Sequence, residues 1–335
     1  MSIELKQAPA ESISSLCYAP SQSRNVLVCT AWDKTLRVYD ADNNEQLAQQ
    51  DFSLPLLDAS FLSDASRVAA GGLSKSLFIF DVATQKVSTL PTVHRAAIKN
   101  CRFHRPTNLL YTSGWDGVIC AWDVRSAGAG PVAQAQLHGK AFAMDLNDTY
   151  LIAADSKKRT YLYDIRQGPQ GLSTPEMRDQ VLKYQVRCIR CFPNGTGFAA
   201  SSIEGRVAWE YFDTSPEVQS KKYAFKCHRI KGKGSETACP VNALSFHPRY
   251  GTFATGGSDG GVSVWDGQSK KRLWRLPPFP TSIAALAFNP SGNQLAIGVS
   301  YLYEKGPMPT APPPQVVVRL VKDEDVRPKA LAAAA

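Results

Sequence analysis

Four basic residues in the stretch 182–229 have side chains that could bind an anion. Arg206 stands in S-I-E-G-R-V, Lys226 and Arg229 stand in Y-A-F-K-C-H-R, and Arg187 ends L-K-Y-Q-V-R. A guanidinium can hold a carboxylate or a phosphate through two parallel hydrogen bonds, and a phosphothreonine with about −1.5 to −2 charges is a suitable ligand. The alternative is a solvated basic rim in which Arg206 pairs with Glu204. The residue types alone favour neither interpretation.

Two tryptophans have the side chain that most often anchors a protein partner. Trp32 and Trp115 each precede an aspartate in a turn-like segment. Leu73 and Ser258 occupy the matching positions of related segments, so the local fold does not require an aromatic ring there. Tryptophan is enriched in protein interfaces, and we expect both residues to contact a partner. Packing over neighbouring structure is the alternative.

No pattern of a catalytic or metal centre accompanies these residues. The chain has no G-x-S-x-G, H-E-x-x-H or G-x-x-x-x-G-K-[ST] segment. Cys188 and Cys191 have C-x-x-C spacing, but no second pair completes a zinc site, and residues three apart on a strand face opposite sides. The eight cysteines are therefore interpreted as free thiols. We predict a protein with no catalytic residues, no metal and no cofactor.

One sequence pattern recurs along the chain: small residues, an acidic or polar turn, then alternating apolar residues that end on an aromatic residue and an acid or tyrosine. Its copies end at positions 40, 81, 123, 164, 211 and 266, which are 41, 42, 41, 47 and 55 residues apart. Such spacing suits units of four short strands, as in WD-repeat propellers. A seventh unit starts at 283–290 and continues at 295–300 and 315–321. The sequence predicts an all-β, seven-bladed WD-repeat β-propeller. Arg206 follows the turn of the fifth unit and Lys226 and Arg229 lead into the sixth, so we expect the basic residues to converge near one face, at the junction of blades five and six.

The two ends of the chain are expected to close the ring. An open sheet edge invites aggregation, so the strand around Ile3–Lys6 should pair in the last blade beside Val316–Val321. Residues 1–326 would then form a single propeller, with the proline-rich segment at about 305–314 as a mobile loop. Residues 327–335 are expected to be a disordered tail, and a cloning remnant is one interpretation of its alanine run.

The histidine and the aspartate of the third unit are assigned to the fold. His94, Thr112 or Ser113, Asp116 and Trp122 are placed to form the hydrogen-bonded network typical of WD repeats. Buried polar groups need partners, and such a network fixes the geometry of a blade.

Other units carry variants of this network. Asp33, Asp259 and His228 are predicted to have similar roles in their own units. Ser74 and Lys157 stand where the aspartate would be, which predicts weaker copies in units two and four.

The overall charge favours acidic partners. A net charge of +9 and a pI near 9.1 attract acidic, phosphorylated or nucleic-acid partners. No apolar run of about 18 residues is present, which argues against a membrane span, and the N-terminal residues lack the features of a secretory signal. These observations lead us to expect an intracellular location.

Several blocks closely resemble one family of propellers. The blocks L-K-Y-Q-V-R-C-I-R (182–190), S-S-I-E-G-R-V-A (201–208) and S-P-E-V-Q-S-K-K-Y-A-F-K-C-H-R (215–229) resemble the mitotic spindle-checkpoint propeller named for "budding uninhibited by benzimidazole". Segments at 240–247, 252–260 and 280–288 extend the resemblance over nearly the whole chain. The Rae/Gle-type mRNA-export propeller is a close relative that shares parts of these blocks.

The resemblance implies a non-enzymatic adaptor of the spindle-assembly checkpoint, in the nucleus and at the kinetochore in mitosis. Trp32, Trp115 and Arg187 would bind the GLEBS motif of Bub- and Mad-family checkpoint proteins. Arg206 and Lys226 would bind phosphorylated Met-Glu-Leu-Thr repeats of the outer-kinetochore scaffold and so recruit checkpoint kinases. The family has Arg or Lys at the last position, so Lys226 keeps the charge without the two-pronged grip.

The partner class follows from the same resemblance. It implies a monomeric propeller in hetero-complexes, with no membrane and no direct nucleic-acid contact. The alternative is an mRNA-export propeller that binds a nucleoporin GLEBS motif, although no aromatic-basic motif of an RNA-binding module is present. A purely structural subunit of a larger assembly is the third hypothesis.

Overall fold

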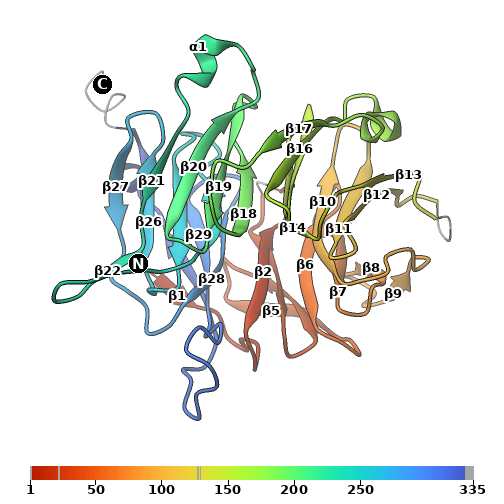
Figure 1. Cartoon of the computed structure of the whole chain (residues 1–335). Helices are drawn as coiled ribbons and strands as arrows, with labels where there is room; N and C mark the ends of the chain where they lie inside the picture. Colours follow the sequence, from red (N-terminus) through yellow and green to blue (C-terminus); the bar gives the residue numbers. More distant parts are fainter. Residues whose placement is uncertain (1, 22, 127, 129, 329–335) are drawn as a thin grey trace.

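The computed structural model describes residues 2–21, 23–126, 128 and 130–328. Its strands form seven four-stranded antiparallel sheets, or blades, whose colours run in chain order around the molecule in Figure 1. The seven-bladed propeller predicted from the repeats is therefore confirmed. Of the helices in the described ranges, none has both the length and the apolar character that crossing a bilayer requires. Most of the expected tail, from residue 329 onward, lies outside the described residues.

Each blade runs from an inner strand at the channel to an outer edge strand, and in blades one to six the four strands follow one another in the chain. Blade one contains β2 (Ile13–Tyr18), β3 (Val26–Ala31), β4 (Thr35–Asp40) and β5 (Glu45–Asp51), and blade two contains β6 (Leu56–Phe61), β7 (Arg67–Gly72), β8 (Leu77–Asp81) and β9 (Val87–Thr89). Blade three contains β10 (Ile98–His104), β11 (Leu109–Gly114), β12 (Val118–Asp123) and β13 (Ala133–Gln136), and blade four contains β14 (Ala141–Leu146), β15 (Tyr150–Asp155), β16 (Arg159–Asp164) and β17 (Glu176–Asp179). Blade five contains β18 (Val186–Cys191), β19 (Gly197–Ser202), β20 (Arg206–Tyr211) and β21 (Tyr223–Lys226), and blade six contains β24 (Val241–Phe246), β25 (Phe253–Gly257), β26 (Val262–Asp266) and β27 (Lys271–Arg275). Blade seven contains β28 (Ile283–Phe288), β29 (Gln294–Val299), β30 (Gln315–Leu320) and β1 (Ser2–Glu4).

A few short elements lie outside the blades. A hairpin of β22 (Arg229–Lys231) and β23 (Glu236–Ala238) projects between blades five and six. The 3-10 helix η1 (Gly168–Leu172) and the helices α1 (Pro216–Gln219) and α2 (Asp323–Val326) complete the described structure.

The N-terminal strand closes the ring as predicted. In blade seven β1 pairs with β30, and Ile3 lies opposite Val318. The backbone N–H of Leu5 donates to the Val316 carbonyl at 2.8 Å, and the Leu5 side chain is buried in the core shared by blades one and seven. The strand β30 is therefore not left with an unpaired edge at the point where the chain begins and ends.

Neighbouring blades share their hydrophobic cores. Successive residues of a strand point to opposite faces of the sheet, so each blade presents one apolar face to the blade before it and one to the blade after it. On β20, Ala208 packs with Ile152 of blade four, whereas Val207 packs with Leu244 and Phe253 of blade six. The blades cannot bury these faces separately, so the propeller packs as one unit.

The turns between the second and third strands of the blades all open on one face, here called the turn face, because every blade has the same strand order. These connections span residues 32–34, 73–76, 115–117, 156–158, 203–205, 258–261 and 300–314. The last of them is the loop that extends furthest down in Figure 1, whereas α1 marks the opposite face. The loop at 305–314 belongs to this connection, and its mobility stays a prediction.

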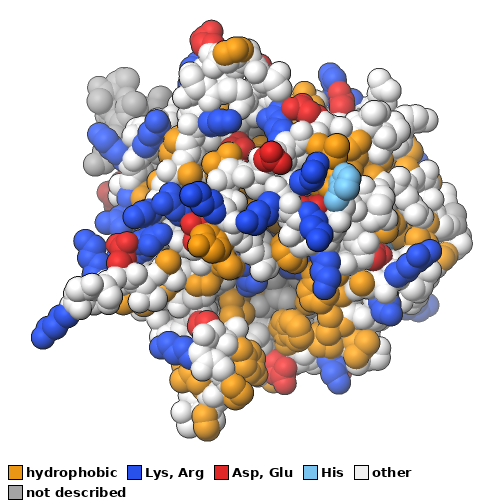
Figure 2. Space-filling model, in the orientation of Figure 1, with side chains coloured by type: hydrophobic (Ala, Val, Ile, Leu, Met, Phe, Trp, Pro, Cys, Tyr) orange, Lys and Arg blue, Asp and Glu red, His pale blue; other side chains and the backbone are white. Residues whose placement is uncertain are grey.

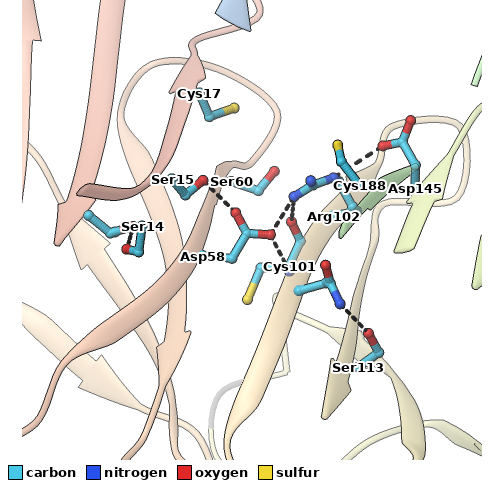
Figure 3. Close-up of polar contacts among 12 residues, drawn as sticks. Ser14, Ser15, Cys17, Asp58, Ser60, Cys101, Arg102, Ser113, Asp145 and Cys188 are labelled. Carbon is cyan, nitrogen blue, oxygen red and sulfur yellow. Dashed lines mark hydrogen bonds and ion pairs between the residues drawn. The ribbon is translucent and has the colours of Figure 1, made fainter. Parts of the chain in front are cut away.

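A chain of polar contacts, here called the inner-strand belt, joins the inner strands of blades one to five. Figure 3 shows its contacts in blades one to four. Ser15 Oγ donates to Asp58 Oδ1 at 2.6 Å, and Asp58 Oδ2 accepts from Arg102 Nη1 at 2.5 Å. Arg102 Nε then donates to Asp145 at 3.1 Å. Asp145 also accepts the backbone N–H of Cys191 on blade five at 2.8 Å.

Arg102 keeps the belt ionised. Burial disfavours the charged form of Asp58, but the charges of Arg102 and Lys99 outweigh it and hold the pKa of Asp58 below its usual value. Although burial acts to lower it, the pKa of Arg102 is raised by Asp58 and Asp145. One guanidinium thus compensates two carboxylates from different blades.

Arg102→Met should lower the free energy of unfolding by about 3–5 kcal/mol at pH 7, because it leaves two buried carboxylates without their cation. The depressed pKa of Asp58 stabilises the native protein above the unfolded pKa of about 4, and this contribution is lost as the pH falls. In the variant, Asp58 and Asp145 are buried charges without a cation, so their protonation at low pH raises the free energy of unfolding. The difference between the two proteins, measured by urea denaturation, should therefore shrink from pH 7 to pH 4.

Arg125→Met is the matched control. Arg125 pairs with Asp123 on the surface, with 66% of its side chain exposed, and its loss should leave stability close to that of the parent chain. An equal effect of the two substitutions would show that the belt does not stabilise the ring.

Candidate peptide-binding face

The five residues predicted to bind partners all lie at the turn face. Trp32 and Trp115 stand in the β3–β4 and β11–β12 turns of blades one and three. Arg206 follows the β19–β20 turn, and Lys226 lies opposite it at the end of β21. Arg187 is the second residue of β18, and it lines the mouth of the central channel. A ligand that touches the two tryptophans and Arg187 must therefore be an extended segment that crosses the ring.

The turn position of the tryptophans has a backbone role that any side chain permits. In all seven blades, the N–H of this residue donates to the carbonyl just before the inner strand, at 2.9–3.1 Å. The donors and acceptors are Trp32 to Ser12, Leu73 to Pro55, Trp115 to Ala97, Ser156 to Lys140, Ile203 to Gln185, Ser258 to Pro240 and Ser300 to Ser282. The Trp32 side chain is 39% exposed, and that of Trp115 is partly exposed. The fold does not require indole rings here.

Arg206 and Lys226 lie side by side, but not where the sequence placed them. They are cross-strand partners within blade five, and they share a sheet face with Ala208 and Ala224, which pack toward blade four. The prediction that the basic cluster meets at the junction of blades five and six is therefore wrong. Strand alternation explains the difference, since Val207 and its neighbours occupy the blade-six face.

A tight turn holds the acid that faces Arg206. Gly205 has φ +64, and a Cβ there would lie 2.8 Å from the Cys227 carbonyl oxygen. Arg229, which the sequence grouped with the anion-binding residues, instead clamps this turn. It donates to the Glu204 carbonyl at 2.9 Å and pairs with Glu236 of the hairpin at 3.3 Å.

The charges at Arg206 and Lys226 are not balanced. Arg206 Nε lies 3.5 Å from a Glu204 carboxylate oxygen, so the surface pair considered as the alternative does form. Lys226 is exposed, and its side chain has no hydrogen bond or ion pair within the described part of the chain. Like charges directly opposite each other on neighbouring strands are destabilising. A dianionic group would offset both cations.

Sequence reasoning missed a cavity on the same face. It lies between the β22–β23 hairpin and the 300–314 connection, has a volume of about 560 Å³, and is lined by Ile230, Phe279, Tyr301 and Met308. Figure 2 shows basic side chains around the hairpin and hydrophobic ones at the projecting loop beneath it. The sequence did contain a signal for this cavity: the last two full repeats are 55 residues apart, which indicates an inserted segment between them.

Known proteins share this architecture and much of this sequence. Residues 4–40, 84–123 and 224–266 match the family model "WD domain, G-beta repeat". The mitotic checkpoint protein bub3 of Dictyostelium discoideum is 39% identical over 96% of both chains. The bub-3 protein of Caenorhabditis elegans is 37% identical over 96% of this chain and 94% of that relative. This chain belongs to the Bub3 family of mitotic checkpoint WD-repeat proteins.

Other known proteins are similar to this chain at lower sequence identity. The Poly(A)+ RNA export protein of Schizosaccharomyces pombe is 32% identical over 91% of this chain and 85% of its own length. The structure of U3-55K superposes with a TM-score of 0.81, covers 95% of this chain and 98% of its own, and is 19% identical. At that identity the superposition shows the shared fold alone.

Two blades contain the hydrogen-bonded network of WD repeats. In blade three His94 Nδ1 lies 3.1 Å from Asp116, its Nε2 lies 2.9 Å from Thr112, and Trp122 Nε1 donates to the same hydroxyl at 2.9 Å. In blade six, three equivalent contacts of 2.7, 2.7 and 2.9 Å link His228, Asp259, Thr255 and Trp265. Both ring nitrogens of each histidine are occupied, so these groups hold the blades.

The other blades vary this network. Asp33 of blade one pairs with Arg37 at 2.9 Å. In blade four Lys157 stands where aspartate was expected, but Asp155 accepts the N–H groups of Lys157 and Arg159, at 2.9 and 3.0 Å. The expectation of a weak fourth copy therefore needs correction, since an acid two residues earlier takes the role. Ser74 Oγ of blade two is buried without a hydrogen-bond partner in the described structure.

The C-x-x-C pair is divided between two interfaces. Cys188 packs in the core toward blade six and Cys191 in the core toward blade four, as strand alternation predicts. Burial raises the pKa of the Cys191 thiol. Within the described ranges, no three His, Cys, Asp or Glu side chains are grouped so that they could hold a metal.

Lys226→Gln should leave stability unchanged or raise it by at most about 1 kcal/mol, because it removes a like-charge cross-strand pair. Glu204→Gln should lower the free energy of unfolding, because Arg206 and Lys226 would then face each other without a nearby carboxylate. Chemical denaturation at low salt measures both. A clear loss of stability in Lys226→Gln would assign this lysine to the fold rather than to a ligand.

Proposed function

We propose that the chain is a non-enzymatic spindle-assembly-checkpoint adaptor. Its turn face holds the GLEBS segment of a Bub- or Mad-family protein, and Arg206 and Lys226 hold a phosphorylated Met-Glu-Leu-Thr repeat of the kinetochore scaffold. The observation that carries the proposal is the placement of these two cations opposite each other, with the Glu204 carboxylate beside Arg206 and with Lys226 unpaired within the described residues. Membership of the Bub3 family supports the same reading.

Phosphorylation would supply the charge that this site lacks. An unmodified threonine offers only a neutral hydroxyl, whereas a phosphothreonine carries about −1.5 to −2 charges and three acceptor oxygens. Arg206 can exchange its 3.5 Å contact with Glu204 for a two-pronged bond to phosphate, and Lys226 adds a point charge. Binding then depends on prior action of a kinase, which makes recruitment to the kinetochore conditional.

The GLEBS segment would lie across the ring. Trp32 and Trp115 have partly exposed rings on blades one and three, and Arg187 of blade five lies at the mouth of the channel. A segment that is disordered when free can cover such a spread of anchors. The rigid turn face needs no rearrangement to receive it, and the bound protein brings its kinase or inhibitory activity to the site.

The chemistry of the buried groups supports a role without catalysis. The histidines of blades three and six are committed to structural hydrogen bonds. Burial also raises the pKa of the Cys101 and Cys191 thiols, which makes them poor nucleophiles at neutral pH.

An export propeller is the second candidate function. The 32% identity to an RNA export protein favours it, but the Bub3 relatives are more similar, at 37–39%. RNA binding that falls steeply with added salt would mark that function.

A phosphorylated Met-Glu-Leu-Thr peptide should bind at least about tenfold more tightly than its unphosphorylated form, since a hydrogen bond to a charged group contributes about 1.5–3 kcal/mol. Arg206→Ala should remove most of this difference in a calorimetric titration. Lys271→Ala, which removes an exposed charge on the outer strand of blade six, should keep it. Equal binding of both peptides to the parent chain would contradict the assignment.

The binding free energy of a GLEBS peptide should become less favourable by about 2 kcal/mol or more in each of three variants, as expected for interface anchors. These variants are Trp32→Ala, Trp115→Ala and Arg187→Ala. The Tm of each tryptophan variant should stay near that of the parent chain, because the turn depends on the backbone N–H. Val132→Ala provides the control, since Val132 is 46% exposed and lies away from the turn face. Undiminished binding by all three variants would favour the structural-subunit hypothesis.

A further inference from the structure

The second residue of each inner strand lies at the turn-face end of that strand. This ring of positions comprises Ser14, Leu57, Lys99, Phe142, Arg187, Asn242 and Ala284. Six of them, all but Phe142, line a cavity of about 70 Å³ in the channel. Its two charged members, Lys99 and Arg187, are both positive.

The channel holds more positive than negative charge. Lys99, Arg102, Arg187 and Arg190 line its wall, whereas Asp58 and Asp145 supply the carboxylates of the inner-strand belt. Arg102 is bonded to both carboxylates, and Arg190 lies 4.0 Å from Asp145. Lys99 is influenced by the charge of Asp58 without forming an ion pair with it, and Arg187 forms none in the described structure, so the four cations outnumber the two carboxylates by two.

The neighbouring polar groups are already bonded to one another. Asn242 donates to Ser258 and to the Ile283 carbonyl, at 3.0 and 3.1 Å, and Ser14 donates to the Leu56 carbonyl at 2.7 Å. Throughout the described ranges, the side chains of Lys99 and Arg187 make no hydrogen bond or ion pair. They are the free donors of this cavity.

The two cations differ in their exposure: Lys99 is partly buried in the channel, and Arg187 is exposed at its mouth. Burial first, and then the like charges of Arg187 and Arg102, lower the pKa of Lys99 against the opposing charge of Asp58. The surrounding channel wall also lowers the pKa of Arg187 by desolvation, although this residue is exposed to solvent at the mouth. Partly desolvated cations are stabilised when a counter-charge lies within hydrogen-bond reach.

We propose that the channel of the free propeller binds one small inorganic oxyanion, phosphate or sulfate, between Lys99 and Arg187. The guanidinium and the ammonium provide directed donors for tetrahedral oxygens. A cavity of about 70 Å³ holds such an ion with a few waters, since one water needs about 10–15 Å³. The site does not rest on the proposed function, because its ligand is a free ion and Lys99 belongs to neither peptide site.

Thermal unfolding of the full chain in inorganic phosphate tests the site. The reference is sodium gluconate at matched ionic strength and pH, because gluconate is too large for the cavity. Phosphate in about tenfold excess over its Kd should raise the Tm of the parent chain by about 2 °C. Lys99→Met and Arg187→Met should lose most of this rise, and Lys86→Met, at an exposed position, should keep it.

Phosphate also stabilises folded proteins in general, because it is excluded from their surfaces. An equal rise in the parent chain and all three variants would mean this general effect only, and it would overturn the proposal. Titration calorimetry with phosphate gives the second readout. Every protein in this titration also carries Arg206→Ala, so that the proposed phosphothreonine site does not contribute heat. The chain with Arg206→Ala alone and its Lys99→Arg variant should show one saturable site and the Lys99→Met variant none, and the absence of heat from the chain with Arg206→Ala alone would also overturn the proposal.

Discussion

A propeller blade has two apolar faces, and only its neighbours can cover them. Ala208 packs against blade four and Val207 against blade six, so every blade depends on the one before and the one after. The same requirement makes closure obligatory, and the three-residue strand β1 satisfies it beside β30. The inner-strand belt adds polar continuity, because Arg102 bridges carboxylates from two other blades. Rigidity of the ring follows from this mutual burial.

Because packing between the blades holds the ring together, the side chains of its turns are available for binding. At each turn the structural contact is a backbone hydrogen bond, so the side chain at that position can be tryptophan, leucine or serine. Trp32 and Trp115 are thus held in place by the scaffold without being needed by it. Folding and recognition use different atoms of the same residues, which is how repeats with one backbone geometry present different side chains to a partner.

The basic residues are divided in the same way between those that stabilise the fold and those that can bind a ligand. Cations that hold the fold together are paired: Arg102 with two aspartates, Arg229 with the turn at Glu204 and with Glu236, and Arg37 with Asp33. Cations that lack such partners lie where a ligand can reach them, at Lys226 on the rim and at Lys99 and Arg187 in the channel mouth. An uncompensated cation on a rigid surface is stabilised by an incoming anion.

The sequence by itself determined the number of blades, the closing strand and the histidine–aspartate networks of blades three and six. These depend on strand periodicity and repeat spacing, which are local and are repeated along the chain. Only the tertiary structure decided which neighbour Arg206 and Lys226 face, that Asp155 replaces the missing aspartate of blade four, and that Arg229 clamps a turn. It also created the cavity beside the hairpin and the two unpaired cations of the channel. Alternation shows that a residue leaves one side of a strand, but the blade or ion that it meets there is set by segments far away in the chain.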